Sequence, residues 1–372
     1  MSRSLDKLSV HGFKSIRELK DFPLHPINIL IGANGAGKSN LVDFFRMLCA
    51  MADGRLQKFV ADGGGADGFF FNGPKETKEA RAQMKFGENQ FRFTLESNAA
   101  NEMFLAEEGI RYTGGRRPSD WYVWEGIVKE SRLPEWKDRG SNYGDYPSAK
   151  AYVYDAVSSW MVYHFHDTSR TAPMRRDCSA RDFRELSADA GNIAAFLLKM
   201  QEQQPARYER IRETVQLIAP FFDNFLLEPQ TKGDNELVRL EWRQKGSKFP
   251  FQPWQLSDGT IRFICLATTL LQPTTPSTIV IDEPELGLHP VALEALSALI
   301  HETSQSAQLI VSTQSAPLLD HFEPEHVVVV ERVEGASAFR RLERDDLEHW
   351  INDYSLGQLL RKNIIETGPA RA

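Results

Sequence analysis

Apolar and polar residues alternate along much of the first third of the chain, a period typical of strands with one face in water. The clearest case is Phe91, Phe93 and Leu95. We predict strands at Leu5–Phe13, Glu18–Leu24, Arg81–Phe86, Gln90–Glu96, Met103–Tyr112 and Trp121–Glu130. The later segments would pair as an antiparallel sheet. Residues 53–74 and 131–149 are rich in Gly, Asp or other polar residues, which predicts loops.

The pattern changes in the middle of the chain. Val153–Phe165 is apolar and aromatic, which indicates a helix end running into a buried strand. Helical spacing is present in Ala188–Gln203 and Ala206–Ile218, with Pro205 as a breaker between them. We predict that these two helices form a short helical arm, followed by strands around a turn at Lys232–Asn235.

A glycine-rich stretch follows the apolar strand Ile27–Ile31 and precedes an amphipathic run. Its residues, Gly32-Ala33-Asn34-Gly35-Ala36-Gly37-Lys38-Ser39, fit the G-x-x-x-x-G-K-S pattern of a phosphate-binding loop. Small residues let the backbone close around a phosphate chain with its N–H groups pointing inward. We expect a helix to start near Gly37, Lys38 to reach the β- and γ-phosphates, and Ser39 to bind Mg²⁺. The predicted nucleotide contacts are Asn34, Gly35, Ala36, Gly37, Lys38 and Ser39.

Two acidic residues end a second buried strand. Thr278–Ile281 is apolar and β-branched, and it leads into Asp282-Glu283-Pro284, which fits a Walker B segment. Such a strand delivers its carboxylates to the C-terminal edge, where ligands bind in open α/β sheets. Asp282 would hold Mg²⁺, and Glu283 would act as the general base on the attacking water.

A third motif, Leu256-Ser257-Asp258-Gly259-Thr260, opens the apolar helix pattern Ile261–Leu271. A Ser and a Gly at a helix N-terminus can form a second anion site, although Ser257 alone also fits an ordinary helix cap. One chain does not need two phosphate sites. The motif therefore suggests two chains, each offering Ser257 and Gly259 to the nucleotide that the other chain holds.

Taken in this order, the motifs resemble the ABC-type ATPase heads of the RecF, SMC and OLD group, and most of all the stand-alone bacterial ATPases of the RecF-like branch. The resemblance is carried by IGANGAGKS, LSDGT, IDEPELGLHP and LIVSTQSAPLL, with GFKSI, SADAGNIAAFL and YSLGQLLRKN as further matches. It implies a P-loop NTPase of the α/β class: an ABC-type head with a mixed parallel core sheet, an antiparallel β subdomain and a short helical arm. The head would comprise residues 1–169 and 246–372, with 170–245 as the arm and hairpin insertion.

The resemblance also implies that ATP and Mg²⁺ bind between two protomers that dimerise on ATP, with residues 285–290 as the D-loop. Two departures stand out. Gln314 occupies the place of a switch histidine; it can hydrogen-bond a γ-phosphate but cannot take up a proton, so slow hydrolysis would follow. We cannot place the glutamine of the Q-loop. His164, His166 and Asp167 occupy about that region, with buried or capping polar groups as the alternative interpretation.

Composition places the chain among ordinary globular proteins, with 372 residues, 41% hydrophobic and 26% charged. No apolar run approaches the roughly 20 residues that cross a bilayer, and the first residues lack the apolar core of a secretory signal. Cys49, Cys178 and Cys265 are widely spaced, which favours reduced thiols over a metal site. We expect a cytoplasmic protein without a membrane partner.

Two functions remain open for such an ATPase. The first is a DNA-associated ATPase in repair or recombination, or in anti-phage defence, suggested by the resemblance and by an arginine cluster: Arg170, Arg175, Arg176, Arg181 and Arg184. Interleaved acidic residues and the net charge of −7 favour a solvated mixed-charge face as the alternative. The second function is a nucleotide-switched sensor that controls a separate effector protein without binding DNA.

A transporter subunit and an in-chain nuclease are both disfavoured. The stretch between the phosphate loop and the third motif is longer than transporter ATPase subunits carry. The chain after Gln314 is too short for a Toprim nuclease domain, and Asp345 and Asp346 lack the alternate spacing that would place both on one face of a strand.

Overall fold

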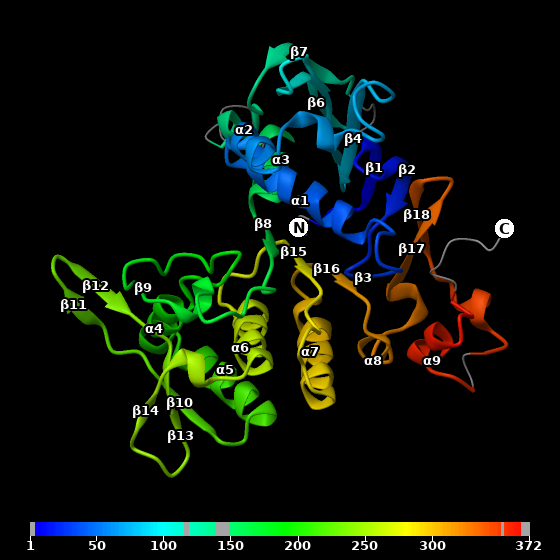
Figure 1. Cartoon of the computed structure of the whole chain (residues 1–372). Coiled ribbons are helices and arrows are strands. Elements are labelled where there is room, and N and C mark those ends of the chain that lie inside the picture. Colours follow the sequence, from blue (N-terminus) through cyan, green and yellow to red (C-terminus); the bar gives the residue numbers. More distant parts are fainter. Residues whose placement is uncertain (1–3, 115–118, 138–148, 351–352, 366–372) are drawn as a thin grey trace.

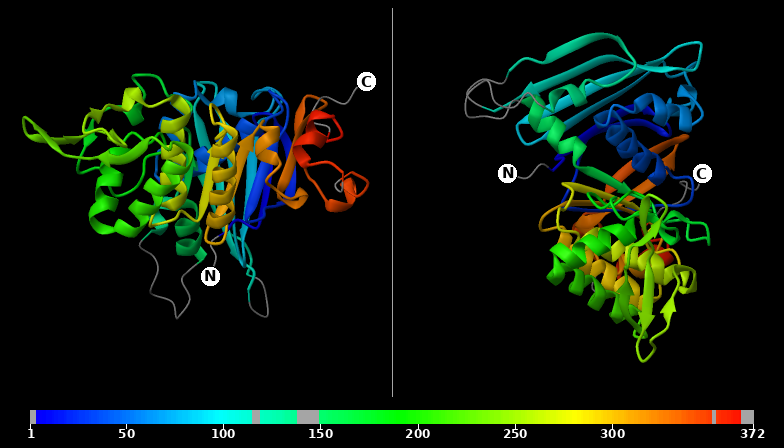
Figure 2. Two further views of the ribbon diagram at one scale, coloured as in Figure 1. Left: turned by 90° about the horizontal axis from the view of Figure 1, so that it is seen from below. Right: turned by 90° about the vertical axis from the view of Figure 1, so that its left-hand side faces the viewer.

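Two six-stranded sheets organise the chain, as the computed structural model in Figures 1 and 2 shows. The structure describes residues 4–114, 119–137, 149–350 and 353–365. The first sheet is antiparallel, in the order β2-β1-β4-β5-β6-β7. Its strands are β1 (Lys7–Phe13), β2 (Ile16–Pro23), β4 (Glu79–Phe86), β5 (Asn89–Ser97), β6 (Met103–Tyr112) and β7 (Tyr122–Val128). In β5 the alternating apolar side chains are the buried ones, which confirms the predicted antiparallel sheet.

The second sheet, in the order β18-β17-β3-β16-β15-β8, is parallel from β17 to β8, with β18 antiparallel at its edge. Its strands are β3 (Ile27–Ile31), β8 (Trp160–Tyr163), β15 (Thr278–Asp282), β16 (Gln308–Thr313), β17 (Val327–Val333) and β18 (Ala336–Arg341). Every residue of β3, β15 and β16 is buried. A parallel sheet covered on both faces requires such continuous apolar runs.

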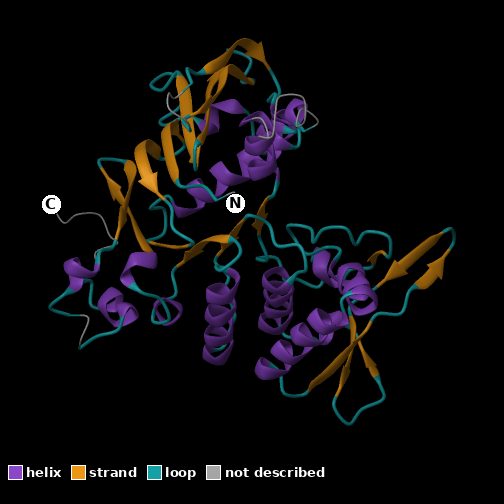
Figure 3. Cartoon of the chain, turned by 180° about the vertical axis from the view of Figure 1, so that it is seen from behind, coloured by secondary structure: helices purple, strands orange, loops and turns teal. Residues whose placement is uncertain are grey.

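Helices cover the two faces of this parallel sheet and create two hydrophobic cores. Helix α1 (Lys38–Ala52) lies between the two sheets, whereas α6 (Asp258–Leu271) and α7 (Pro290–Thr303) pack on the opposite face. Along β15, Val280 joins the core of α1, while Ile279 and Ile281 join the core of α6 and α7. Figure 3 shows the division from behind, with the antiparallel strands above and the long helices of the second core below.

The two helices predicted as an arm share this second core. Both α4 (Ile193–Gln203) and α5 (Pro205–Ile218) contribute buried side chains to it, and α5 packs directly on α6. Beyond them lie two small antiparallel sheets, β10-β13-β14 and β11-β12-β9. Their strands are β9 (Cys178–Ser179), β10 (Phe222–Leu226), β11 (Gln230–Lys232), β12 (Asn235–Val238), β13 (Glu241–Gln244) and β14 (Pro250–Phe251). The domain boundaries at 170 and 245 stay a prediction.

The remaining helices are α2 (Leu56–Asp62), α3 (Ala149–Ser158), α8 (Ala316–Leu319) and α9 (Leu356–Arg361). The prediction of a continuous loop over residues 53–74 was wrong, because α2 and a short 3-10 turn lie within it. The carboxylate of Glu130 accepts the backbone N–H groups of Leu56 and Gln57 at 2.8 and 3.0 Å. A residue remote in sequence therefore caps α2, and no local capping signal announces it. The predicted loop 131–149 also holds a 3-10 turn, Leu133–Trp136; its residues 138–148 lie outside the described part.

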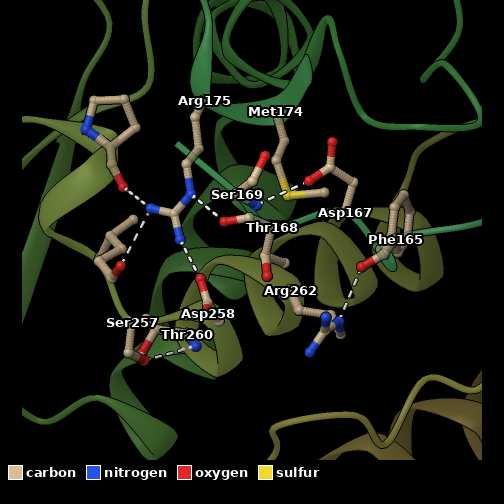
Figure 4. A network of polar contacts seen from close by, with 12 residues as sticks. Phe165, Asp167, Thr168, Ser169, Met174, Arg175, Ser257, Asp258, Thr260 and Arg262 are labelled. Carbon is tan, nitrogen blue, oxygen red and sulfur yellow. Dashed lines mark hydrogen bonds and ion pairs between the residues drawn. The ribbon is translucent and has the colours of Figure 1, made fainter. Parts of the chain in front are cut away.

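A buried arginine ties the segment after β8 to the start of α6 (Figure 4). The Arg175 guanidinium donates to the carbonyls of Thr168 at 2.9 Å and Leu256 at 3.2 Å, to that of Pro253, and to the Asp258 carboxylate at 2.8 Å. Only 5% of Arg175 is exposed, whereas the other four arginines of the predicted cluster are exposed. Including Arg175 in a DNA-facing cluster was therefore wrong: its charge is used inside the fold.

We expect Arg175→Met to lower the free energy of unfolding by at least about 1 kcal/mol, because the buried Leu256 carbonyl loses its donor at a cost of roughly 1–3 kcal/mol, while the Pro253 carbonyl keeps the Leu256 backbone N–H at 3.3 Å. The matched control is Arg176→Met, which changes an exposed neighbour and should stay within about 0.5 kcal/mol of the parent. Urea unfolding followed by circular dichroism measures both. Equal stability of the two variants would contradict the structural role of Arg175.

Candidate functional site

The predicted phosphate loop joins β3 to α1 at the carboxyl edge of the parallel sheet. Helix α1 begins at Lys38 with Gly37 as its N-cap, as predicted. Gly37 has φ of 113°, and a Cβ there would lie 1.9 Å from the Ser337 Oγ. A Cβ on Gly32 would lie 2.2 Å from the Val330 carbonyl oxygen. The loop is thus pressed against β17 and β18, and only glycine fits at these two positions.

Two serine hydroxyls, one on β18 and one in the turn between β1 and β2, support the loop from behind. The Ser337 hydroxyl donates to the Ala36 carbonyl at 2.5 Å, and it lies 2.6 Å from the Ser15 hydroxyl. The Asn40 side-chain amide on α1 donates to Ser15 at 2.5 Å. Ser15 belongs to the GFKSI turn between β1 and β2, whose Lys14 also pairs with Asp43 on α1 at 2.6 Å. The antiparallel sheet therefore holds the loop and the start of α1 in place.

The side chain of Lys38 folds back over its own loop. Its ammonium donates to the carbonyls of Gly32 at 2.7 Å and Ala33 at 3.3 Å. Burial lowers the pKa of Lys38, and the charges of Glu283, Asp282 and Glu285 oppose that shift. This lysine and the acidic segment after β15 therefore lie close enough to interact electrostatically. Asn34, Gly35 and Ser39 are exposed at the rim of the loop.

The acidic segment is held by the neighbouring strand β16. Asp282 is buried, and its carboxylate accepts the Ser312 hydroxyl at 2.5 Å. The next residue, Glu283, donates its backbone N–H to the Ser312 carbonyl at 2.8 Å and has φ of 44°. A left-handed conformation costs a non-glycine residue roughly 1–2 kcal/mol. Such strain collects at functional sites, where surrounding contacts enforce it.

Gln314 reaches both glutamates of this segment. Its side-chain amide donates to the Glu283 carboxylate at 2.5 Å, and its backbone N–H donates to the Glu285 carboxylate at 2.8 Å. Burial raises the pKa of Glu285, and its second oxygen has no hydrogen-bond partner among the described residues. The structure thus brings together Lys38, Asp282, Glu283 and Gln314, which the sequence predicted as one site.

The three residues considered for the Q-loop region separate into two groups. The rings of His164 and His166 lie with their centroids 3.9 Å apart, and the His166 Nε2 is 3.0 Å from the Asp282 carbonyl oxygen. Burial lowers the pKa of His164, and the neighbouring His166 lowers it further. Asp167 is exposed and accepts the Ser169 backbone N–H at 2.9 Å, so it closes a turn. For Asp167 the capping interpretation therefore applies.

The motif around Ser257 lies at the N-terminus of α6, against residues 287–289. The Ser257 hydroxyl accepts the Thr260 backbone N–H at 3.1 Å, so the helix-cap alternative is realised, and the residue is exposed. A Cβ on Gly259 would lie 2.1 Å from the Gly287 carbonyl oxygen. A surface cavity of about 460 Å³ opens here, and no phosphate-loop residue lines it among those the structure describes. Ser257 and Gly259 therefore form a second surface, apart from the phosphate loop of the same chain.

A second buried arginine connects α6 to the segments around it. Arg262 donates from Nε to the Phe165 carbonyl at 2.9 Å (Figure 4), from Nη2 to the His166 carbonyl at 3.2 Å, and from Nη1 to the Leu286 carbonyl. Sequence reasoning missed Arg262 and also Ser337. The GFKSI match gave Ser15 no role, and one arginine in an apolar helix or one serine on a distant strand carries no local signal.

Comparison with known proteins gives a family match over most of the chain. Residues 27–320 match the family model described as "AAA domain, putative AbiEii toxin, Type IV TA system". No curated protein matches the chain. No helix among the described residues combines the length and apolarity needed to span a membrane.

Two solved structures share the fold at low sequence identity. The crystal structure of an Smc head bound to the C-terminal winged-helix domain of ScpA has a TM-score of 0.58 and 16% identity, over 92% of this chain and 98% of that one. An Smc head domain with an extended coiled coil, bound to the C-terminal domain of ScpA derived from Pyrococcus furiosus, has a TM-score of 0.53 and 15% identity, over 94% and 98%. The chain therefore belongs to this AAA domain family and shares the fold of the Smc head domains.

Proposed function

We propose that the chain binds ATP with Mg²⁺ and hydrolyses it in a site completed by a second copy of the chain. The observation that carries this proposal is the convergence of three strand ends. Strands β3, β16 and β15 are adjacent and parallel, so the phosphate loop, Gln314 and the pair Asp282 and Glu283 follow the same edge of one sheet. Ligands of open α/β sheets bind at this edge.

The residues present fit both ATP and Mg²⁺. The loop amides and the N-terminus of α1 favour phosphate groups. Ser39 and Asp282 supply the oxygen ligands that Mg²⁺ prefers, and Ser312 orients the Asp282 carboxylate by donating to Oδ1. Bound Mg²⁺ would neutralise charge on the transferred phosphate. In this proposal Glu283 accepts the proton of the attacking water, and Gln314 holds its carboxylate in position.

The proposal extends to a head-to-head dimer that forms on ATP. The surface at Ser257, Gly259 and Gly287 is open in the single chain, and apolar side chains rim it: Leu217 is 68% exposed and Val291 is 50% exposed. Exposed apolar side chains beside a helix N-terminus suit a face that another protein covers. The N-terminus of α6 would then contact the γ-phosphate held by the partner.

The setting we propose is DNA repair, recombination or anti-phage defence. The printed name of the matched family, a toxin of a type IV toxin–antitoxin system, supports the defence setting. The alternative is a nucleotide-switched sensor that regulates a separate effector and does not bind DNA. The internal position of Arg175 favours this alternative, because it removes one charge from the proposed DNA-binding cluster. Salt-dependent DNA binding separates the two: binding supports the first, and none at low salt, with or without ATP, supports the second.

We expect Lys38→Ala to abolish ATP binding, because the loop loses the cation that would leave the Gly32 carbonyl for the phosphates. Titration calorimetry with Mg²⁺-ATP measures this loss. Lys58→Ala, on the exposed side of α2, is the matched control and should bind as the parent does. Unchanged affinity in Lys38→Ala would refute the phosphate-loop assignment.

We expect Glu283→Gln to retain ATP binding and to lose at least about 100-fold in turnover, because the amide cannot accept a proton from water. Phosphate release under saturating ATP measures turnover. Glu285→Gln tests the neighbouring carboxyl group as the alternative base, since Gln314 contacts both residues. Normal turnover in Glu283→Gln, combined with its loss in Glu285→Gln, would move the base to Glu285.

We expect ATP to convert monomers of Glu283→Gln into dimers, because hydrolysis cannot release them. Adding Ser257→Arg should block dimerisation, since the long side chain would fill the space where the partner's phosphate docks, and should leave ATP binding intact. Ser306→Arg is the matched control, because Ser306 follows the C-terminus of α7, whereas the surface around Ser257 lies at the N-terminus of α7. Light scattering with Mg²⁺-ATP decides between the outcomes. An oligomeric state independent of ATP, with full turnover in Ser257→Arg alone, would show that the site works within one chain.

A further inference from the structure

Strand alternation places two histidines and one aspartate on the same side of the sheet. His164 and His166 are two residues apart in the extended segment after β8, with Phe165 between them in the core of α6. Strand β8 pairs in parallel with β15, with Tyr163 opposite Ile281, so His164 and Asp282 follow at adjacent positions. The residues two positions earlier, Val162 and Val280, both belong to the core of α1. All three polar side chains therefore point to the side of α1 and the phosphate loop.

The three side chains are close enough to share one ion. One ring nitrogen of each histidine and one carboxylate oxygen of Asp282 lie within 4.8 Å of one another. The His166 Nε2 faces the Asp282 carbonyl oxygen at 3.0 Å, and a carbonyl can only accept a hydrogen bond. The tautomer with the proton on Nε2 satisfies this contact and leaves the lone pair of Nδ1 for an ion. Metal-binding histidines characteristically donate their other ring N–H to a carbonyl or carboxylate in this way.

Surrounding groups hold the backbone of both histidines and the side chain of Asp282 in place. Arg262 donates to the carbonyls of Phe165 and His166 and so fixes the backbone that carries the second histidine. The backbone N–H of His164 donates to the Ala188 carbonyl at 3.0 Å. The Ser312 hydroxyl fixes one oxygen of Asp282. A metal site requires such support, because its ligands must converge without large rearrangement.

We propose that His164, His166 and Asp282 bind one divalent transition-metal ion of the Co²⁺ or Zn²⁺ class through two imidazole nitrogens and one carboxylate oxygen. Imidazole suits these ions, whereas Mg²⁺ takes oxygen ligands and keeps several waters. Three protein ligands leave positions open for water or a phosphate oxygen. The inference rests on the proposed function in one respect: Asp282 is also the proposed Mg²⁺ ligand, so this ion would join the nucleotide site.

Cobalt is the probe that tests the site, because its visible absorption reports nitrogen ligation. Co²⁺ is titrated into the metal-free, untagged full chain without nucleotide, and stoichiometry is measured by calorimetry. We expect one Co²⁺ per chain, a visible band, and no displacement by a large excess of Mg²⁺. His164→Gln and His166→Gln should each weaken binding by at least about tenfold. His11→Gln, an exposed histidine of β1, is the matched control and should bind as the parent does.

Three outcomes would overturn the inference: no stoichiometric binding of Co²⁺, full displacement by Mg²⁺, or unchanged affinity in the double variant His164→Gln, His166→Gln. The Mg²⁺ competition uses the parent chain, so it decides even if a variant fails to fold. Lys38→Ala separates this inference from the proposed function. This variant should no longer bind ATP and should still bind Co²⁺. A parent chain that binds ATP but not Co²⁺ refutes only the metal site, and one that binds Co²⁺ but not ATP refutes only the nucleotide site.

Discussion

The parallel pairing of β3, β16, β15 and β8 is the constraint on which the rest of the structure depends. Its register sets Ile31 beside Thr313, Ser312 beside Asp282, and Ile281 beside Tyr163. Because all four strands run the same way, their carboxyl ends meet at one edge. Because both faces are covered by helices, polar side chains gather where the strands end. A shift of one residue in β15 would turn Asp282 toward the core of α6.

Charged and hydroxyl side chains hold several of the loops at this edge. Ser337 and Ser15 press on the phosphate loop, while Arg175 and Arg262 bind the carbonyls of the segments that approach α6. Both guanidinium groups are buried, so their hydrogen bonds to carbonyls form in a medium where an unpaired group is costly. These two arginines therefore tie the segment Phe165–Thr168 to the start of α6.

Most of the fold was readable from local patterns, and the exceptions share a physical cause. Alternation predicted β4 to β6, and the glycines of the phosphate loop predicted the start of α1. Helix α2 was missed because Glu130, remote in sequence, caps it. Arg175 was assigned to a surface cluster because four other arginines lie near it in the sequence, and its carbonyl partners cannot be recognised from their residue types. Every residue has a backbone carbonyl, so a hydrogen bond to one does not depend on the residue type of the partner. Sequence alone therefore cannot predict such a contact.

Negative charge accumulates at the proposed nucleotide site. Lys38 faces three carboxyl groups, those of Asp282, Glu283 and Glu285, and their combined charge opposes the lowering of its pKa. Burial already raises the pKa of Glu285, and the neighbouring Glu283 raises it further. ATP would add several negative charges beside them. One lysine cannot offset this repulsion, so we expect a divalent cation at Asp282 to be a condition of nucleotide binding and not only of hydrolysis. The imidazoles of His164 and His166 lie next to the Asp282 carboxylate, so they would influence which divalent cation binds there.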